Sequence, residues 1–433
     1  MTTTEEHVVP AQLRSTREYR AFLGLAMASA AISIDLLLPA FGEMRRHFGL
    51  PDSSPATAGL ITTFFIGMGL GPLPFGLFSD RFGRRRTVLV ACTMFVISAI
   101  ACIFAPSLAL MKVARFFWGF GAAGFRVAST AMIRDRHSGA SMAREVAFAM
   151  TIFMLVPIFA PLLGAGLIEV LPWRSVFVTC ALFGVVLAAW STRIGETLPP
   201  ERRQPFDVRQ VKVATQAIVQ SRSALTYTLA MIPLFGVFSS YLASSERIVG
   251  KVFNRPDWFP YVFGVTAIMM GAASLVTGRN VQRIGLQRLI LGAVITYTMA
   301  CVVVLGLSIA GDGRPNFWAF FGFFTVVLVT HNMIIPNMNA AAMMPVGHVA
   351  GTAAAIIAML STVGGAVIGS RIDGMFDGTV GPSSAAFVIS AFVALALVLW
   401  ARRSPPAPAA PVTVPVPASA VASSSADPTN SGV

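Results

Sequence analysis

Hydrophobic residues gather in this chain into long, nearly uninterrupted stretches, and most charged residues lie in the short segments between them. A helix needs about 20 mostly apolar residues to cross the roughly 30 Å hydrocarbon core of a bilayer. Twelve stretches meet this requirement, near residues 21–41, 56–78, 87–106, 109–132, 146–170, 174–192, 224–245, 259–278, 289–310, 316–338, 349–370 and 384–401. The pattern predicts an all-α polytopic membrane protein with twelve transmembrane helices.

Composition agrees with a chain dissolved in lipid, because 55% of its residues are hydrophobic, 12% are charged and the mean hydropathy is +0.73. Basic residues indicate its orientation, since short cytoplasmic loops carry an excess of Lys and Arg. With both termini in the cytoplasm, 21 of the 32 basic residues lie on that face and eight on the other; Lys112, Arg115 and Arg126 lie inside a stretch. The formal charge of +13 therefore follows from topology and argues against nucleic-acid binding.

The longest connection separates six stretches from six, which predicts two halves. Gly76, Arg81, Gly83 and Arg86 recur 202 residues later as a second set at corresponding turns: Gly278, Arg283, Gly285 and Arg288. The expected division is a cytoplasmic tail at 1–20, a first half at 21–194, a cytoplasmic central loop at 195–222, a second half at 223–402 and a disordered, Pro/Ala/Ser-rich cytoplasmic tail at 403–433.

The four cysteines all fall within apolar stretches: Cys92, Cys102, Cys180 and Cys301. Buried thiols of this kind serve as small apolar residues. We therefore expect free cysteines, with no disulfide framework and no metal site.

The segment from Gly76 to Arg86 resembles the loop signature of the major facilitator superfamily. The resemblance implies that glycines permit a tight turn, while the acidic and basic side chains lock helix ends in one conformation and release them in the other. The gate residues it implies are Gly76, Asp80, Arg81, Gly83 and Arg84. The second half has Gln282 where an aspartate is expected, so its copy of the gate should be weaker.

Two further motifs are similar to those of the same superfamily. Arg115 begins a Gly-rich run that resembles an intramembrane arginine motif associated with proton coupling. Pro157, Pro161 and Gly164 resemble the antiporter motif of drug:proton exchangers, although Val156 and Ala160 stand where glycine is usual. The proline motif also resembles the bicyclomycin and chloramphenicol resistance branch of the superfamily. The same likeness extends to Asp35 and Pro39 in the first half and to Pro336-Asn337 and residues 350–353 in the second. This implies a bacterial inner-membrane carrier that functions as a monomer.

Asp35 and Arg115 are the candidates for proton coupling. An ionised carboxylate in mid-bilayer costs several kcal/mol unless it faces a polar cavity or a partner. Asp35 lies six residues before the outer end of its stretch and Arg115 six residues after the outer start of its own, so a rise of about 1.5 Å per residue puts them at similar depth. Their proximity is a hypothesis. The alternative is that Asp35 only caps or packs against polar neighbours.

Three further residues are candidates for the substrate cavity: Arg126, His331 and Asn337. Arg126 could instead extend to the interface as an anchor, and a lone histidine is often a hydrogen-bonded packing residue. Asn339 shares the prediction made for Asn337. For Pro157 and Pro161 the alternative to a bending or leak-preventing role is a static kink.

These features predict a secondary active transporter that works by alternating access, with proton-coupled efflux of lipophilic drug-like molecules. The alternative is uptake or export of a particular metabolite or vitamin such as riboflavin. No Gly-x-x-x-x-Gly-Lys-Ser/Thr loop is present, so the proton gradient is the expected energy source and no cofactor is expected. An enzyme is disfavoured because no His-Glu-x-x-His or other catalytic cluster is present, and a sensor because neither tail could form a signalling domain.

Overall fold

The computed structural model describes residues 16–204 and 208–403, and every secondary-structure element within them is helical. The predicted tails lie largely or wholly outside these residues. The first half holds α1 Thr16–Asp35, α2 Phe41–His47, α3 Gly59–Leu70, α4 Pro72–Phe82, α5 Arg84–Ile103, α6 Leu108–Arg136, α7 Gly139–Val170 and α8 Ser175–Ser191. The remaining helices are α9 Val208–Gln220, α10 Arg222–Arg247, α11 Phe259–Ile284, α12 Leu286–Ala310, α13 Phe317–Met343, α14 Ala350–Gly374 and α15 Gly381–Arg402.

Each of the twelve predicted stretches is helical, although 56–78 is divided between α3 and α4, and this confirms the all-α transmembrane fold. By length and hydropathy, nine helical segments of the described chain can cross a bilayer, and a pair bent by 41° between α3 and α4 would be a tenth. One of the nine, Phe317–Gly374, contains both α13 and α14, and α8 is an apolar helix of 17 residues. The bend falls at Gly71-Pro72, where proline lacks the N–H that a continuous helix needs.

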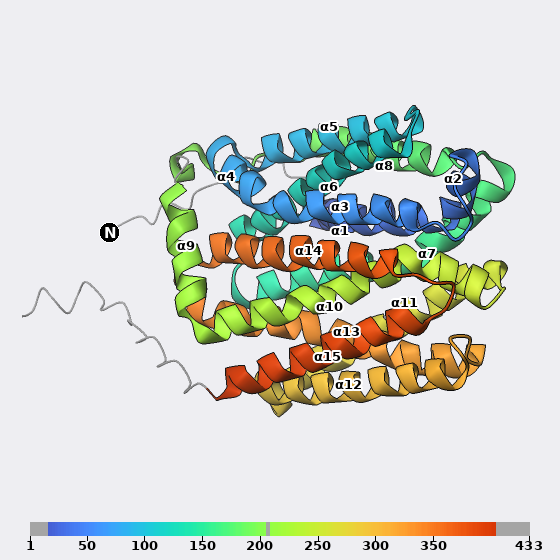
Figure 1. Cartoon of the computed structure of the whole chain (residues 1–433). Helices are drawn as coiled ribbons and strands as arrows, with labels where there is room; N and C mark the ends of the chain where they lie inside the picture. The colour runs from blue at the N-terminus through green and yellow to red at the C-terminus, as the bar shows by residue number, and fades with distance from the viewer. Residues whose placement is uncertain (1–15, 205–207, 404–433) are drawn as a thin grey trace, which may run out of the picture.

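The long helices run side by side between two ends of the molecule (Figure 1). One end carries α9 and is called the α9 end; the opposite end carries α2 and is called the α2 end. The two six-helix halves meet where α14 packs against α3 and α4, and where α11 packs against α7. At this surface Gly69 of α3 lies directly against Thr362 and Val363 of α14. The four cysteines are free and buried, as predicted.

The central connection contains a helix that the sequence analysis did not predict. In α9 the apolar residues Val211, Ala214 and Ile218 lie three and four positions apart, which places them on one helix face. Ala214 and Ile218 are buried, whereas Lys212 is exposed. The helix packs on α14, on α10 and on the 3₁₀ turn Met344–Val349, and Figure 1 shows it lying across the long helices.

Helices α3 and α6 approach so closely that their backbones touch. A Cβ atom at Gly67 would overlap the carbonyl oxygen of Phe116, and one at Gly119 would overlap that of Phe64. Because backbone cannot move aside as a flexible side chain can, we expect Gly119→Ala to destabilise the protein by about 3 kcal/mol or more. Gly166→Ala is the control, since a Cβ there meets nothing within 4 Å. Thermal unfolding of the purified variants measures the difference, and equal midpoints would contradict the packing.

Candidate functional site

The turn between α4 and α5 depends on one glycine backbone conformation. Gly83 ends α4 and precedes α5 with φ +99°, a region that residues with a side chain rarely adopt. Gly285 does the same between α11 and α12 with φ +85°. The repeat found in the sequence therefore corresponds to two equivalent turns, one in each half.

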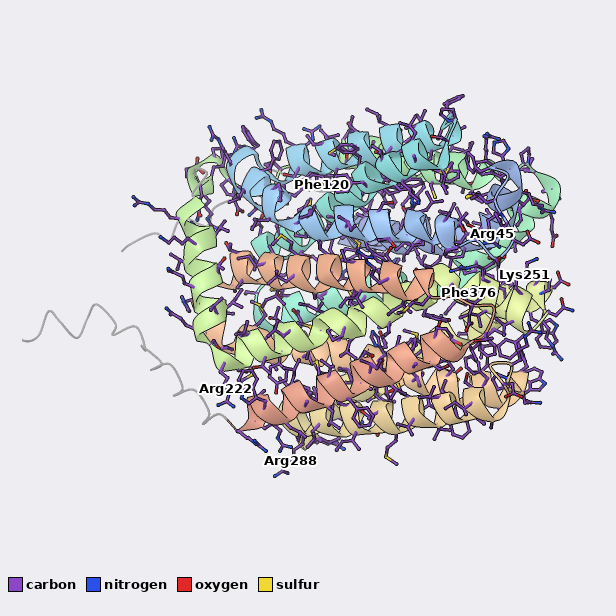
Figure 2. All side chains as sticks on the ribbon, in the orientation of Figure 1. Arg45, Phe120, Arg222, Lys251, Arg288 and Phe376 are labelled. Atoms are coloured by element: carbon purple, nitrogen blue, oxygen red, sulfur yellow. The ribbon has the colours of Figure 1, made fainter. Side chains whose placement is uncertain are left out.

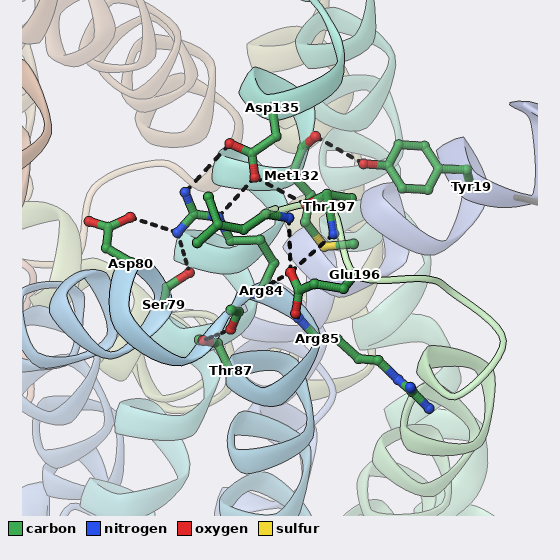
Figure 3. A network of polar contacts seen from close by, with 12 residues as sticks. Tyr19, Ser79, Asp80, Arg84, Arg85, Thr87, Met132, Asp135, Glu196 and Thr197 are labelled. Atoms are coloured by element: carbon green, nitrogen blue, oxygen red, sulfur yellow. Dashed lines mark hydrogen bonds and ion pairs between the residues drawn. The ribbon is translucent and has the colours of Figure 1, made fainter. Parts of the chain in front are cut away.

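Arg84 is the centre of a polar network at this turn (Figure 3). Its side chain is 8% exposed, its Nη1 donates to Asp80 Oδ1 at 2.6 Å and to Ser79 Oγ at 3.0 Å, and its Nε donates to Asp135 Oδ2 at 2.9 Å. A guanidinium has donors in a fixed fork, so it can bind several acceptors at once. Arg84 thereby ties the ends of α4, α5 and α6 together.

The central segment joins the same network, which the sequence analysis missed. The Glu196 carboxylate accepts the backbone N–H of Arg84 at 2.8 Å and that of Arg85 at 3.2 Å, at the positive N-terminal end of α5. Thr197 Oγ1 donates to Asp135 Oδ2 at 3.0 Å. The sequence does show that Glu196 is an acidic residue just after a predicted span. No local pattern, however, indicated that it would cap the N-terminus of α5.

The other predicted gate residues lie around this network without forming its centre. Gly76 is half-buried, with open space where a Cβ would point. Arg81 is exposed, with its guanidinium carbon 5.3 Å from the ring centre of Phe82. In the second half Arg283 and Arg288 are exposed, and within the described residues neither forms an ion pair.

Asp35 lies at the last residue of α1 and is 4% exposed. Within the described residues it forms no hydrogen bond or ion pair, so the hypothesis of direct pairing with Arg115 does not describe this conformation. Arg115 is fully buried and donates instead to two backbone oxygens, Ser33 O at 3.0 Å and Leu60 O at 3.3 Å. Arg115 and Asp35 nevertheless lie at similar depth along the helices, as predicted, because Arg115 binds the backbone two residues before Asp35.

Two aromatic rings hold the Arg115 guanidinium in place. Its central carbon lies 4.4 Å from the ring centre of Phe64 and 4.8 Å from that of Trp118. Arginine is weakly hydrated and stacks on aromatic faces, so it tolerates this setting better than lysine would. One nitrogen, Nη2, is buried without a hydrogen-bond partner in the described residues.

The antiporter-motif helix packs against the same point of α1. Gly164 of α7 is buried against the Leu36 carbonyl and the Pro39 ring, directly after Asp35. Pro157 and Pro161 lie inside α7, which continues as one helix from residue 139 to 170. The structure thus brings Asp35, Arg115 and Gly164 from three helices to one region of the first half.

Comparison with known proteins identifies the family. A model described as "Major Facilitator Superfamily" matches residues 23–369. The chain belongs to the Major Facilitator Superfamily. It is 27% identical over 377 residues to the uncharacterized MFS-type transporter YdgK of Bacillus subtilis, covering 86% of this chain and 92% of the relative. It is 25% identical to a bicyclomycin resistance protein homolog of Haemophilus influenzae, with the same coverage.

The fold agrees with that of a solved transporter structure. The crystal structure of a D-xylose–proton symporter superposes with a TM-score of 0.71 over 89% of this chain and 97% of the symporter, at 11% sequence identity. At so low an identity the likeness concerns architecture alone. It confirms the two pseudo-symmetric six-helix halves of the major facilitator fold.

In this Major Facilitator Superfamily protein the second half presents a row of aromatic residues on α10. Phe235, Phe238 and Tyr241 are spaced three residues apart, and Phe235 meets Phe65 of α3 across the halves with ring centres 5.0 Å apart. His331 of α13 stacks on Phe238 at 5.1 Å and 14°. Helix α10 also packs on the 3₁₀ turn Leu38–Ala40, which follows Asp35 in the chain. The row therefore lies beside the inter-half surface, on a helix that contacts the segment after Asp35.

The three predicted cavity residues differ in their surroundings. His331 is 3% exposed, and its Nδ1 has no hydrogen-bond partner in the described residues. Asn337 is buried and donates to the Met333 carbonyl of its own helix at 2.6 Å. Arg126 has an exposed side chain, which fits either a polar cavity or an interfacial position. Within the part of the chain that the structure describes, no hydrogen bond or ion pair joins these three residues to one another.

The α2 end is bridged by charged residues from both halves, which the sequence analysis missed. Arg45 Nη2 binds both carboxylate oxygens of Glu246, at 3.0 and 2.9 Å. Lys251 Nζ binds Asp52 Oδ2 at 2.7 Å. Arg45 and Asp52 come from the first half, and Glu246 and Lys251 from the second. Opposite charges at the outer ends of spans were visible in sequence, but the partners are about 200 residues apart.

The exposed bridge between Asp52 and Lys251 predicts a pH effect. The hydrogen bond from Lys251 lowers the pKa of the Asp52 carboxyl below its ordinary value of 3.8. A lowered folded-state pKa stabilises the fold above the unfolded pKa, and this stabilisation disappears as the pH falls through the folded pKa. We expect Asp52→Asn to lower the thermal midpoint slightly at pH 7. The difference from the unmodified protein should vanish in acid, and a difference that persists there would contradict the assignment.

Proposed function

We propose that this protein is a secondary active transporter that exports lipophilic drug-like molecules in exchange for protons by alternating access. The observation that carries the proposal is Asp35, a buried carboxylate without an ion-pair partner in the described residues, placed where the antiporter-motif helix meets α1. Such an acid can exchange a proton when water reaches it from either side of the membrane. Arg115 acts beside it by holding the backbone of Ser33.

In the proposed cycle the halves, residues 21–194 and 223–402, rock against each other around a site at mid-membrane. The α2 end faces outward and the α9 end inward, in the bacterial cytoplasmic membrane, with both termini in the cytoplasm. The distribution of Lys and Arg supports this orientation. The Arg84 network, with Gly76, Asp80, Arg81 and Gly83, is the inner gate.

Two observations support a lipophilic substrate. The aromatic row of α10 offers flat apolar surface near Asp35, and aromatic side chains dominate sites that bind apolar ligands. A relative aligned over 86% of this chain is named a bicyclomycin resistance protein homolog. Arg126, His331 and Asn337 are proposed as polar residues of the cavity, and Pro157, Pro161 and Gly164 as the helix that prevents proton leakage. The proton gradient is the energy source, and the monomer is the functional unit.

Transport in a defined system tests the proposal. Purified protein in liposomes with an acidic interior and a pH-sensitive dye is exposed to antibiotics, cationic dyes and vitamins. We expect lipophilic drugs to release protons and vitamins to have no effect. If only a vitamin triggers proton movement, the proposed drug efflux is wrong and metabolite transport is the function. If a compound accumulates without proton movement, proton coupling is refuted.

A further inference from the structure

A second, buried charge pair lies behind the bridges at the α2 end. Arg247, the last residue of α10, is 1% exposed, and Asp373 in the last turn of α14 is 5% exposed. The Arg247 Nη2 and Asp373 Oδ1 atoms are 3.9 Å apart, too far for a hydrogen bond. Ser240 Oγ donates to the same Asp373 oxygen at 2.8 Å. Both charges belong to the second half.

Arg247 also reaches the first half. Its Nη1 donates to the Ser53 carbonyl at 3.4 Å, while the preceding residue, Glu246, binds Arg45 of the first half. Figure 2 shows Arg45, Lys251 and Phe376 in this part of the molecule, and the Arg247 guanidinium lies 4.8 Å from the Phe376 ring centre. Arg247 is therefore positioned between a carboxylate of its own half and the backbone of the other.

The pair is incompletely satisfied. Arg247 Nε and Nη2 and Asp373 Oδ2 are buried without hydrogen-bond partners in the described residues. Among the described residues, Asp373 faces the charge of Arg247, and Arg247 in turn lies near the ion pair between Glu246 and Arg45. Two buried arginines are thus balanced by two carboxylates. Removing one member of such a buried set leaves an uncompensated charge, which is strongly destabilising.

We propose that Asp373 and Arg247 are positioning residues of the transport cycle that keep the α2 end closed, with Asp373 supplying the countercharge that lets Arg247 stay buried between the halves. Without this countercharge, Arg247 regains a favourable environment when the α2 end opens and water reaches it. The proposal rests on the alternating-access function proposed above. Neither residue belongs to a motif identified in the sequence. The pair could not be predicted, because its members are 126 positions apart and meet only through the packing of α10 on α14.

The test measures closure of the α2 end without any transported compound. Spin labels are attached at Arg46→Cys in the first half and Asp257→Cys in the second, two exposed positions, while the native cysteines are buried. Pulsed electron paramagnetic resonance then gives the populations of short and long distances. Asp373→Asn keeps the acceptor for Ser240 but removes the charge. We expect it to lower the ratio of closed to open protein at least about tenfold.

A double variant separates charge balance from simple damage. Arg247→Gln alone should also favour opening, because it leaves Asp373 buried and unpaired, whereas Asp373→Asn with Arg247→Gln should restore most of the closed population. Asp52→Asn is the matched control, since its exposed pair with Lys251 also crosses the halves, and it should change the ratio only a few-fold. If Asp373→Asn cannot be purified, Arg247→Gln and the double variant provide the same comparison.

Two results would overturn the proposal: a closed population in Asp373→Asn equal to that of the parent, or a double variant as open as the single ones. Drug transport is measured separately in the liposome assay. A protein that moves no drug but shows the expected distance changes would refute drug efflux and leave the closure mechanism supported.

Discussion

Replacing Asp35 by asparagine is expected to abolish proton release driven by substrate. The carboxamide has nearly the same shape but no exchangeable acid proton, so we expect the initial rate of proton movement to fall at least about a hundredfold. The residue is buried and forms no ion pair within the described chain, so the substitution removes no salt bridge that holds the fold. Asp35→Glu, which retains an acid, should keep part of the activity.

The control for Asp35 is another carboxylate near the same end of the molecule. Glu43 of α2 is partly exposed and pairs with exposed Arg46 at 3.3 Å, so Glu43→Gln should release protons at the unmodified rate. Drug binding is measured on the same samples by fluorescence quenching. Proton release by Asp35→Asn at the rate of the unmodified protein would show that another group carries the proton.

Replacing Arg84 by glutamine is expected to have the second largest effect. The substitution leaves Asp135, which is 16% exposed, without its charged partner, and it separates the ends of α4, α5 and α6. Losing one member of a largely buried ion pair costs about 3 kcal/mol or more. We therefore expect a lower thermal midpoint and about a tenfold slower transport cycle, because the inner gate no longer adopts one defined closed geometry.

Arg85 provides the matched control, because it is the next residue and has the same side chain. It is exposed, and its guanidinium reaches only the Thr192 carbonyl at 3.4 Å in the described contacts. Arg85→Gln should change the thermal midpoint and the drug-driven proton rate little. If both variants lose the same amount of stability and transport rate, positive charge on this surface is what matters. The specific hydrogen bonds of Arg84 would then have no special role.

The sequence by itself determined the transmembrane architecture. Length and hydrophobicity of a span are local properties, because each helix satisfies its own backbone hydrogen bonds inside the bilayer. The twelve stretches therefore correspond to helices, and Gly83 and Gly285 occupy equivalent turns because their φ values suit glycine. Helix α9 was not predicted, because its 13 residues are fewer than a membrane span needs and their apolar positions form only a short amphipathic pattern.

The tertiary structure alone decided which polar groups meet. Equal depth in the membrane placed Asp35 and Arg115 at one level, but the rotation of each helix about its axis directs the arginine to the Ser33 and Leu60 carbonyls. Arg45 meets Glu246 across 201 positions, and Arg247 meets Asp373 across α10 and α14. Such contacts depend on the relative placement of helices, which packing of whole faces determines and no local pattern records.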